Sequence, residues 1–386
     1  MERMNMELYF DNAATTPLLS DVKKVLQEQM DNYGNPSSLH HLGVKAEQVL
    51  TQTRKDVLRC AGRKNDDVIF TGSGTEANNL AIFGVAQLRD RPGHAVTTAL
   101  EHPSVLEAFK RLERLGWKIS YVKPDDNGVI TSAQILREVQ DDTALVSVMH
   151  VNNETGDIFP VSEISAALKA YPKVRFHVDG IQAFGKIPNA AEVSGADLYS
   201  LSGHKIGAPK GIGALIVRRG VQLQPLLYGG GQERGLRSGT ENVLGIAALG
   251  TASKLAARDM SESYPHVSTL MRQLREGLKN IPGCVVDERP LNFSPYIVST
   301  SFPGLKGEVL VHTLEEEGLY VSTGSACSTQ GGHAKASHVL EALGRETREI
   351  TGTLRFSLAR WQSEEDVNKA LEIVKSRAAW LADIMK

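Results

Sequence analysis

Short apolar runs alternate with helical patterns between about residues 66 and 217 of the chain. Strands that alternate with helices in this way are typical of an α/β fold, in which a mainly parallel sheet carries helices on both faces. The apolar runs predict strands at 68–71, 95–98, 119–122, 144–149, 174–178, 198–200 and 214–217. The amphipathic patterns predict helices at 76–88, 103–115 and 161–170.

The pattern changes after residue 242. Helical periodicity predicts helices at 243–257, 271–278, 306–317 and 364–385, and apolar runs predict strands at 284–286, 297–302 and 355–358. This mixture is typical of a smaller α+β domain. We therefore expect a large domain over residues 15–260 and a small domain over residues 1–14 and 261–386.

Composition narrows the function classes. The 386 residues are 41% hydrophobic and 23% charged, and the net charge of -2 gives no whole-molecule attraction to nucleic acid or to an anionic membrane. No apolar stretch approaches the roughly 18 residues of a transmembrane helix, and residues 1–11 lack the apolar region of a signal peptide. We expect a cytoplasmic protein.

The cysteines are Cys60, Cys284 and Cys327. Because their number is odd and no C-x-x-C occurs, we expect neither a disulfide framework nor an all-cysteine zinc site, and we predict no metal. Cys60 lies in a helical pattern and Cys284 at the start of a strand, so we expect both to be structural.

A glycine-rich turn follows the first predicted strand. Residues 68–77 read VIFTGSGTEA, which places Gly72 and Gly74 between a strand and a helix. The first N–H groups of such a helix attract a phosphate. A dinucleotide fold also needs an acid at the end of the next strand, but Asp90 precedes that strand. The turn therefore predicts a phosphate site and weakens the hypothesis of a NAD-dependent dehydrogenase.

Two ionisable residues directly follow strands. Asp179 comes after the strand at 174–178, and Lys205 comes shortly after the strand at 198–200. Ligands of α/β sheets bind at the carboxyl ends of the strands. A lysine there can form a Schiff base, and an acid can pair with a protonated pyridine nitrogen. Together with a phosphate site, the two residues suggest pyridoxal 5'-phosphate (PLP), although either one alone would more often be a surface cation or a helix cap.

The chain resembles the cysteine desulfurases of the NifS/IscS type, which are class V aminotransferase-like enzymes of PLP fold type I. The resemblance covers nearly the whole chain, and its specificity comes from the order of the motifs. They are LYFDNAATTP (8–17), GNPSS (34–38), FTGSGTEANN (70–79), EHP (101–103), MHVNNETG (149–156), VDGIQ (178–182), SGHK (202–205), GGGQERGLRSGT (229–240), SACS (325–328) and LRFS (354–357).

The resemblance implies a role for each matching residue. Lys205 would hold PLP as a Schiff base, Asp179 would pair with the pyridine nitrogen, and His102 would stack on the ring and move protons. Gln182 would donate to the ring oxygen. The remaining cofactor contacts would be to the phosphate, from Gly74, Thr75, Ser202 and His204, and from Thr240 of the partner in a homodimer.

The resemblance also implies the substrate contacts and the nucleophile. Asn153 and Arg355 would bind the carboxylate of L-cysteine. Cys327 would attack the substrate sulfur, giving L-alanine and a persulfide for a sulfur-acceptor protein of iron–sulfur cluster assembly or thiolation. The sequence around Cys327 is small, polar and glycine-rich, which is typical of a mobile loop.

Several alternatives stay open. A selenocysteine lyase or a class V aminotransferase would share the PLP site, although a transaminase does not need a cysteine at residue 327. A non-catalytic sulfur-delivery or scaffold protein would not need Asp179, Lys205, Cys327 and Arg355 together. Of the other polar residues, we interpret His150 and His177 as core histidines and His333 and His338 as non-catalytic, and we expect Arg237 near the phosphate or a dimer interface.

Overall fold

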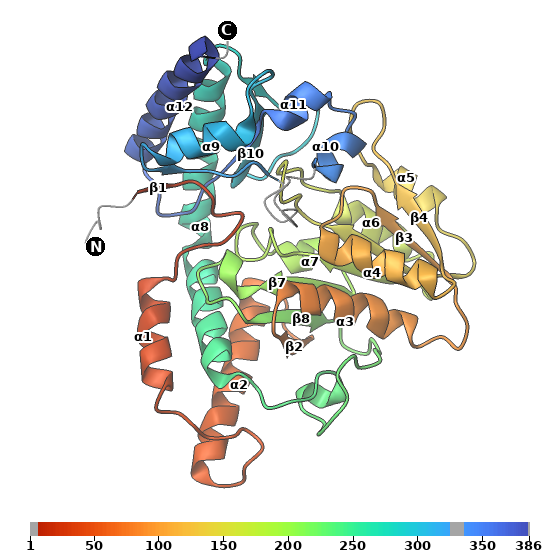
Figure 1. Ribbon diagram of the computed structural model, residues 1–386. Helices are drawn as coiled ribbons and strands as arrows, with labels where there is room; N and C mark the ends of the chain where they lie inside the picture. Colours follow the sequence, from red (N-terminus) through yellow and green to blue (C-terminus); the bar gives the residue numbers. More distant parts are fainter. Residues whose placement is uncertain (1–6, 325–335, 385–386) are drawn as a thin grey trace.

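A seven-stranded sheet forms the centre of the computed structural model, which describes residues 7–324 and 336–384 (Figure 1). All seven predicted strands are present, and the prediction of a mainly parallel sheet is confirmed. The exception is β8, which runs antiparallel to both of its neighbours. In spatial order the strands are β2 (Asp67–Thr71), β8 (Gly213–Val217), β7 (Leu198–Ser202), β6 (Arg175–Asp179), β5 (Thr143–Met149), β3 (His94–Thr98) and β4 (Lys118–Val122).

Helices cover both faces of this sheet, as the alternating pattern predicts. Neighbouring side chains of a strand point to opposite faces, so Ile69 packs in the core under α3 (Gly74–Ala86) and α4 (Pro103–Arg114). Val68 and Phe70 pack in the other core, with α2 (His41–Cys60) and α6 (Val161–Leu168). The shorter elements are α1 (Ser20–Gln29), α5 (Ser132–Arg137), α7 (Ala190–Ser194), η1 (Gly203–Lys205) and η2 (Glu233–Gly235).

One long helix replaces two predicted ones. The expected helices at 243–257 and 271–278 are parts of α8 (Val243–Lys279), which continues through Pro265. Proline removes one helical hydrogen bond, but Val267, Leu270 and Met271 beyond it are buried, and their packing maintains the helix. Residue 260 lies within α8, so the division at this residue stays a prediction.

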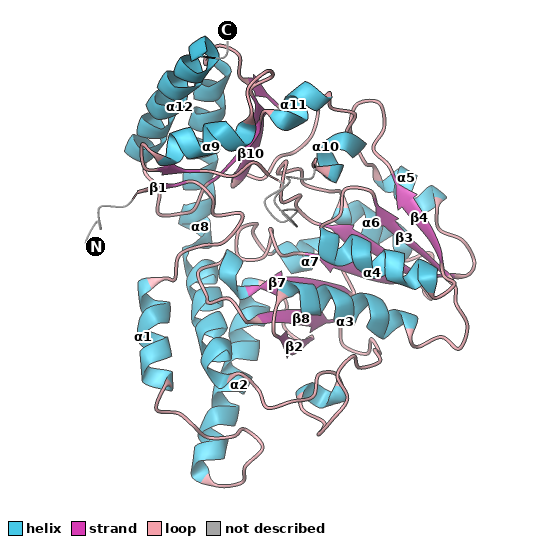
Figure 2. Ribbon diagram, viewed as in Figure 1, coloured by secondary structure: helices cyan, strands magenta, loops and turns pink. Residues whose placement is uncertain are grey.

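The C-terminal part has its own sheet and helices (Figure 2). Strand β10 (Ile297–Ser301) pairs antiparallel with β9 (Val285–Val286) and with β12 (Thr353–Ser357). The N-terminal strand β1 (Leu8–Tyr9) pairs parallel with β11 (Leu319–Tyr320), which brings the start of the chain to this part of the molecule. The helices here are α9 (Gly307–Glu315), α10 (His338–Ala342), α11 (Thr347–Thr351) and α12 (Glu364–Ile384). Among the described residues, no helix has the length and apolar character needed to cross a membrane.

Candidate active site

The predicted cofactor residues meet at one edge of the large sheet. Asp179 ends β6, Ser202 ends β7, and Lys205 follows in η1. The strand register places Gly213 beside both Ser202 and Thr71, the last residue of β2. The turn that leads into α3 therefore lies next to Ser202.

The N-terminus of α3 forms a tight cradle at this edge. Gly74 begins the helix, and a Cβ atom there would lie only 2.4 Å from Cδ1 of Ile181 and 3.2 Å from Cβ of Ser202. Ser73 caps the helix by accepting from the Glu76 N–H at 3.1 Å. The N–H groups of Gly74 and Thr75 belong to the first turn and have no partner within the helix. These donors and the absence of a side chain at Gly74 suit an anion.

Glu76 links the cradle to Arg237. Its Oε2 accepts from the Gly72 N–H at 2.8 Å, and its Oε1 accepts from Nε of Arg237 at 2.9 Å. The expectation that Arg237 lies near the phosphate position agrees with this contact. Thr240, three residues further along, is exposed.

His204 precedes Lys205 in η1 and lies beside the N-terminal segment. Its Nδ1 is 3.2 Å from Oγ1 of Thr15. Burial, together with the nearby cations Lys205, Lys210 and Lys186, lowers the pKa of His204 to about 4. The ring is therefore neutral at pH 7.

Asp179 is a buried carboxylate with two neutral donors among the described residues. Its Oδ2 accepts from Nδ2 of Asn78 at 2.8 Å, and its Oδ1 accepts from the Ile181 N–H at 3.0 Å. Neither donor carries a charge, so a protonated ring nitrogen would give Asp179 the cationic partner that a buried carboxylate needs. The sequence patterns did not single out Asn78, although it lies within the FTGSGTEANN motif.

A chain of hydrogen bonds joins Asp179 to His102. Asn78 also donates to Oγ of Ser104 at 2.9 Å, and this hydroxyl lies 2.8 Å from Nδ1 of His102. His102 caps α4, because its Nδ1 accepts from the Ser104 N–H at 3.1 Å. The neutral ring therefore carries its proton on Nε2, which takes no part in the cap. The pKa of His102 is lowered, mainly by burial and also by the nearby Lys205 and His338. The carboxylate of Asp179 acts against this shift by raising the pKa.

Lys205 lies against the N-terminal segment. Its Nζ donates to the backbone carbonyls of Ala13 and Ala14. Gln182 donates from Nε2 to the same Ala13 carbonyl at 2.9 Å, and its Oε1 accepts from Nζ of Lys186 at 3.0 Å. Lys186 was not among the predicted site residues, since a single lysine gives no signal in the sequence.

Arg355 lies on β12 and is 3% exposed. Its Nη1 donates to the Asn153 carbonyl and its Nη2 to Oδ1 of Asp11, both at 2.8 Å. Its Nε is buried without a hydrogen-bond partner among the described residues. The structure thus brings the two predicted carboxylate-binding residues together and adds Asp11. A buried guanidinium N–H without a partner suits a carboxylate ligand.

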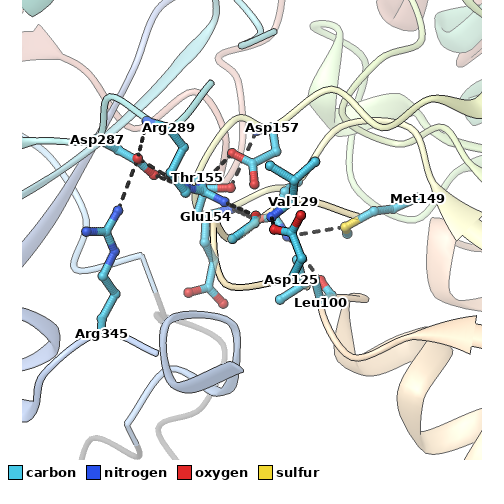
Figure 3. A network of polar contacts seen from close by, with 12 residues as sticks. Leu100, Asp125, Val129, Met149, Glu154, Thr155, Asp157, Asp287, Arg289 and Arg345 are labelled. Atoms are coloured by element: carbon cyan, nitrogen blue, oxygen red, sulfur yellow. Dashed lines mark hydrogen bonds and ion pairs between the residues drawn. The ribbon is translucent and has the colours of Figure 1, made fainter. Parts of the chain in front are cut away.

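A polar network holds the segment that carries Asn153 (Figure 3). Asn152 accepts from the N–H groups of Glu154 at 2.8 Å and Thr155 at 3.0 Å. Asp157 accepts from Nη2 of Arg289 at 2.8 Å. Asp287, in the C-terminal part, pairs with Arg289 and with Arg345. This network ties the end of β5 to the C-terminal part, and so it fixes the position of Asn153 relative to Arg355.

Cys327 and His333 lie outside the described residues. The described residues on both sides contact the site. Ser322 exchanges backbone hydrogen bonds with Arg355, from Ser322 N–H at 3.2 Å and from Arg355 N–H at 2.6 Å. Ser337 donates to Oε2 of Glu154, and Nε2 of His338 lies 2.9 Å from the Glu101 carbonyl. Both attachment points of the segment with Cys327 therefore adjoin the residues around Asn153 and Arg355.

The histidines and cysteines expected in the core are buried or half-buried. His177 is fully buried between the hydroxyls of Ser147 at 2.8 Å and Ser200 at 2.9 Å, and His150 is buried against the Tyr199 hydroxyl at 3.1 Å. The interpretation of both as core histidines is confirmed. Burial raises the pKa of Cys60 and of Cys284 to about 12, so both thiols stay protonated at neutral pH.

Taken together, these residues fit PLP. The α3 cradle suits its phosphate, and Asp179 suits its protonated ring nitrogen. Lys205 lies at the same edge of the sheet, where its amine could join the carbonyl carbon of PLP. The fit depends on the first-turn N–H groups of α3, which Gly74 allows to pack closely against Ile181 and Ser202, and on the buried Asp179 with its neutral donors.

Comparisons with known proteins agree with this site. The family model described as aminotransferase class-V matches residues 8–370. The chain is 38% identical over 375 residues to cysteine desulfurase IscS of Dictyoglomus turgidum, covering 96% of this chain and 94% of the relative. It is 39% identical over 372 residues to cysteine desulfurase IscS of Methanosarcina thermophila, covering 96% and 91%. A solved structure of a NifS-like protein superposes with a TM-score of 0.89 at 36% identity, over 97% of this chain and 100% of that one.

Proposed function

The chain belongs to the aminotransferase class-V family, and from this premise we propose that it is a PLP-dependent cysteine desulfurase. Its reaction takes L-cysteine to L-alanine and retains the sulfur on the enzyme as a persulfide. The observation that carries the proposal is the meeting of the α3 cradle, the buried Asp179 and Lys205 at one edge of the sheet.

The substrate would be oriented by its carboxylate. Arg355 offers the buried Nε group, and the fork of a guanidinium matches the two oxygens of a carboxylate. Asn153 is held beside Arg355 through its own carbonyl, so its side-chain amide can supply a second donor.

The proton transfers belong to Lys205 and His102. When bound, PLP supplies an electron sink that stabilises negative charge on the substrate Cα. Asp179 keeps the ring nitrogen protonated, which strengthens that sink. The amine of Lys205 removes the Cα proton, and His102, neutral because its pKa is lowered, can donate the proton that it carries on Nε2 and then recover it.

Sulfur transfer would use Cys327. Its thiolate attacks the substrate sulfur and forms a new S–S bond. The substrate C–S bond breaks with its electron pair left on carbon, which takes a proton to give L-alanine. Cys60 and Cys284 do not compete, since burial raises the pKa of both thiols to about 12.

The test compares two cysteine variants of the holoenzyme. Cys327→Ala should keep the yellow colour of bound PLP and lose alanine formation from L-cysteine, whereas Cys284→Ala should keep both. Lys205→Ala should lose the absorption of the lysine-linked cofactor. Alanine formation at the parent rate by Cys327→Ala would refute the assignment of the nucleophile.

We also infer a homodimer with shared sites. Three large apolar side chains are strongly exposed, with Leu39 97%, Tyr33 81% and Tyr228 77% accessible. Thr240 is the last residue of the 229–240 segment, which directly follows Tyr228, and it is exposed, so it is accessible to a phosphate site of a second copy. Sedimentation should give a dimer mass, and Leu39→Asp should shift it towards the monomer. A monomeric parent would contradict the inference.

We infer further that the persulfide passes to a sulfur-acceptor protein in the cytoplasm, for iron–sulfur cluster assembly or thiolation. This inference is supported by the similarity of the chain to two relatives that carry the name cysteine desulfurase IscS. Incubation with radiolabelled L-cysteine and a cysteine-containing scaffold protein should move the label to the scaffold. Retention of all the label on Cys327 would argue against that acceptor.

A further inference from the structure

Lys186 is a buried cation without a described function. It lies in the turn after β6 and is 6% exposed. Among the described residues its charged neighbours are Lys205 and Arg355, and its Nζ is 5.9 Å from the centroid of the Tyr296 ring, so it has cations and an aromatic ring around it and no carboxylate. Burial, together with the nearby Lys205 and Arg355, lowers the pKa of Lys186 to about 7. Burying a lysine without a counter-ion is costly, which points to a role for this side chain.

Its polar contact leads into the cofactor site. Nζ of Lys186 donates to Oε1 of Gln182 at 3.0 Å. Nε2 of Gln182 donates to the Ala13 carbonyl at 2.9 Å, and Lys205 donates to the same carbonyl. Lys186, Gln182, Ala13 and Lys205 thus form one continuous relay of hydrogen bonds.

The relay fixes which way the Gln182 amide faces. An ammonium group only donates and a backbone carbonyl only accepts. Lys186 therefore selects Oε1 of Gln182 on its side, and Ala13 selects Nε2 on the side of Lys205. The amide nitrogen has a second N–H, which this orientation leaves on the Lys205 side.

We propose that Lys186 is a positioning residue of the cofactor site, which holds the Gln182 amide with Nε2 towards Lys205 so that it can donate to the oxygen of the PLP ring. This inference rests on the proposed function, because the acceptor of the second N–H is part of the cofactor. Without Lys186, only the Ala13 carbonyl still orients the Gln182 amide, so the amide is held less firmly and its donor to the ring oxygen is weakened.

The orientation has a spectroscopic consequence. The Lys205 nitrogen, once joined to PLP, carries a proton that the ring oxygen attracts, and loss of this proton changes the colour of the cofactor. A donor from Gln182 to the ring oxygen weakens that attraction. Removing Lys186 therefore shifts the colour transition to higher pH, by about one unit for the loss of one charge-assisted hydrogen bond.

The experiment follows this transition in the purified holoenzyme. Lys186→Met keeps the length of the side chain and removes both its charge and its donor, so the transition should move up by about one pH unit. Lys186→Arg keeps both and should restore a transition near that of the parent. Lys210→Met removes an exposed positive charge close to His204 without touching Gln182, and its transition should match that of the parent.

Gln182→Leu separates the relay from a simple charge effect. This variant removes the Gln182 amide that donates to the ring oxygen, so on its own it should raise the pH of the colour transition. Adding Lys186→Met to it should then change little, because coupled residues are not additive. If Lys186 were merely structural, its replacement would lower the melting temperature without moving the pH of the colour transition.

Two results overturn the inference. One is a transition in Lys186→Met, or in Gln182→Leu, that equals that of the parent; the Gln182 variant decides the matter even if Lys186→Met fails to fold. The other is a full additional shift when both substitutions are combined. A parent protein that binds no PLP would instead refute the proposed function, so the two failures are distinguishable.

Discussion

Arg355→Lys tests the substrate-binding role of Arg355 most directly. The lysine keeps the positive charge, but its single ammonium cannot replace a planar fork that reaches the Asn153 carbonyl, Asp11 and a ligand at the same time. The substitution should therefore weaken binding of L-cysteine more than it slows the chemistry.

The expected magnitude follows from the contacts. A hydrogen bond to a charged group contributes about 1.5–3 kcal/mol. Loss of one such bond to the substrate carboxylate, at about 2 kcal/mol, corresponds to roughly a 30-fold rise in KM. The protein itself should lose about 1–3 kcal/mol of stability, because the buried carbonyl of Asn153 or the carboxylate of Asp11 is left with a weaker partner.

The assay is the rate of alanine formation as a function of L-cysteine concentration, with the absorbance of bound PLP as a check on the fold. Arg63→Lys is the matched control, since Arg63 also donates to a carboxylate, that of Asp66 at 3.0 Å, and to a backbone carbonyl, that of Ala191, and neither of these partners belongs to the candidate site. Its KM should stay at the parent value. A KM for Arg355→Lys within two-fold of the parent would show that Arg355 does not bind the carboxylate.

Three further predictions concern protonation and the neighbourhood of Cys327. Because burial raises the pKa of Cys60 and Cys284 to about 12, a thiol reagent at pH 8 should label Cys327 alone, and mass spectrometry that finds either of the others labelled would disprove this. Burial lowers the pKa of His177 from 6.5 to about 3, so the unfolded chain binds more protons below pH 6.5 and His177 costs stability as the pH falls. Urea titrations should therefore show that the difference in unfolding free energy between the parent and His177→Asn is smaller at pH 5 than at pH 7.5, by about 2 kcal/mol. A difference that stays constant over this pH range would contradict the prediction. Glu154→Ala removes the acceptor of the Ser337 hydroxyl and should reduce desulfuration about tenfold while the PLP spectrum stays unchanged; parent activity would rule out this anchoring role.

The sequence predicted the elements whose signal is local. Each strand of the large sheet is a short apolar run, and the residues that follow strand ends, Asp179 and Lys205, were found because ligands bind at that edge. The split of α8 into two helices was wrong because polar residues around Pro265 interrupt the apolar pattern, while burial of Val267 and Leu270 against other elements maintains the helix.

Contacts between distant segments could not be predicted in this way. Asn78 appears as an ordinary polar residue of a helix, and its role comes from the register that places α3 opposite the end of β6. Lys186 looks like any surface lysine until the fold buries it beside Gln182. A motif can identify such residues as a group, but only the topology shows which atom meets which.

The N-terminal segment shows how the two halves of the proposed reaction are joined. Asp11 holds Arg355, and two residues later the carbonyl of Ala13 accepts from Lys205 and Gln182. A substrate carboxylate can bind Nε of Arg355 while Asp11 keeps Nη2, and Lys205 must leave the Ala13 carbonyl to reach the cofactor. Both contacts belong to one short stretch of backbone, which β1 fixes to β11. Residues 11–13 therefore set the position of the guanidinium that binds the substrate relative to the amine that moves the proton.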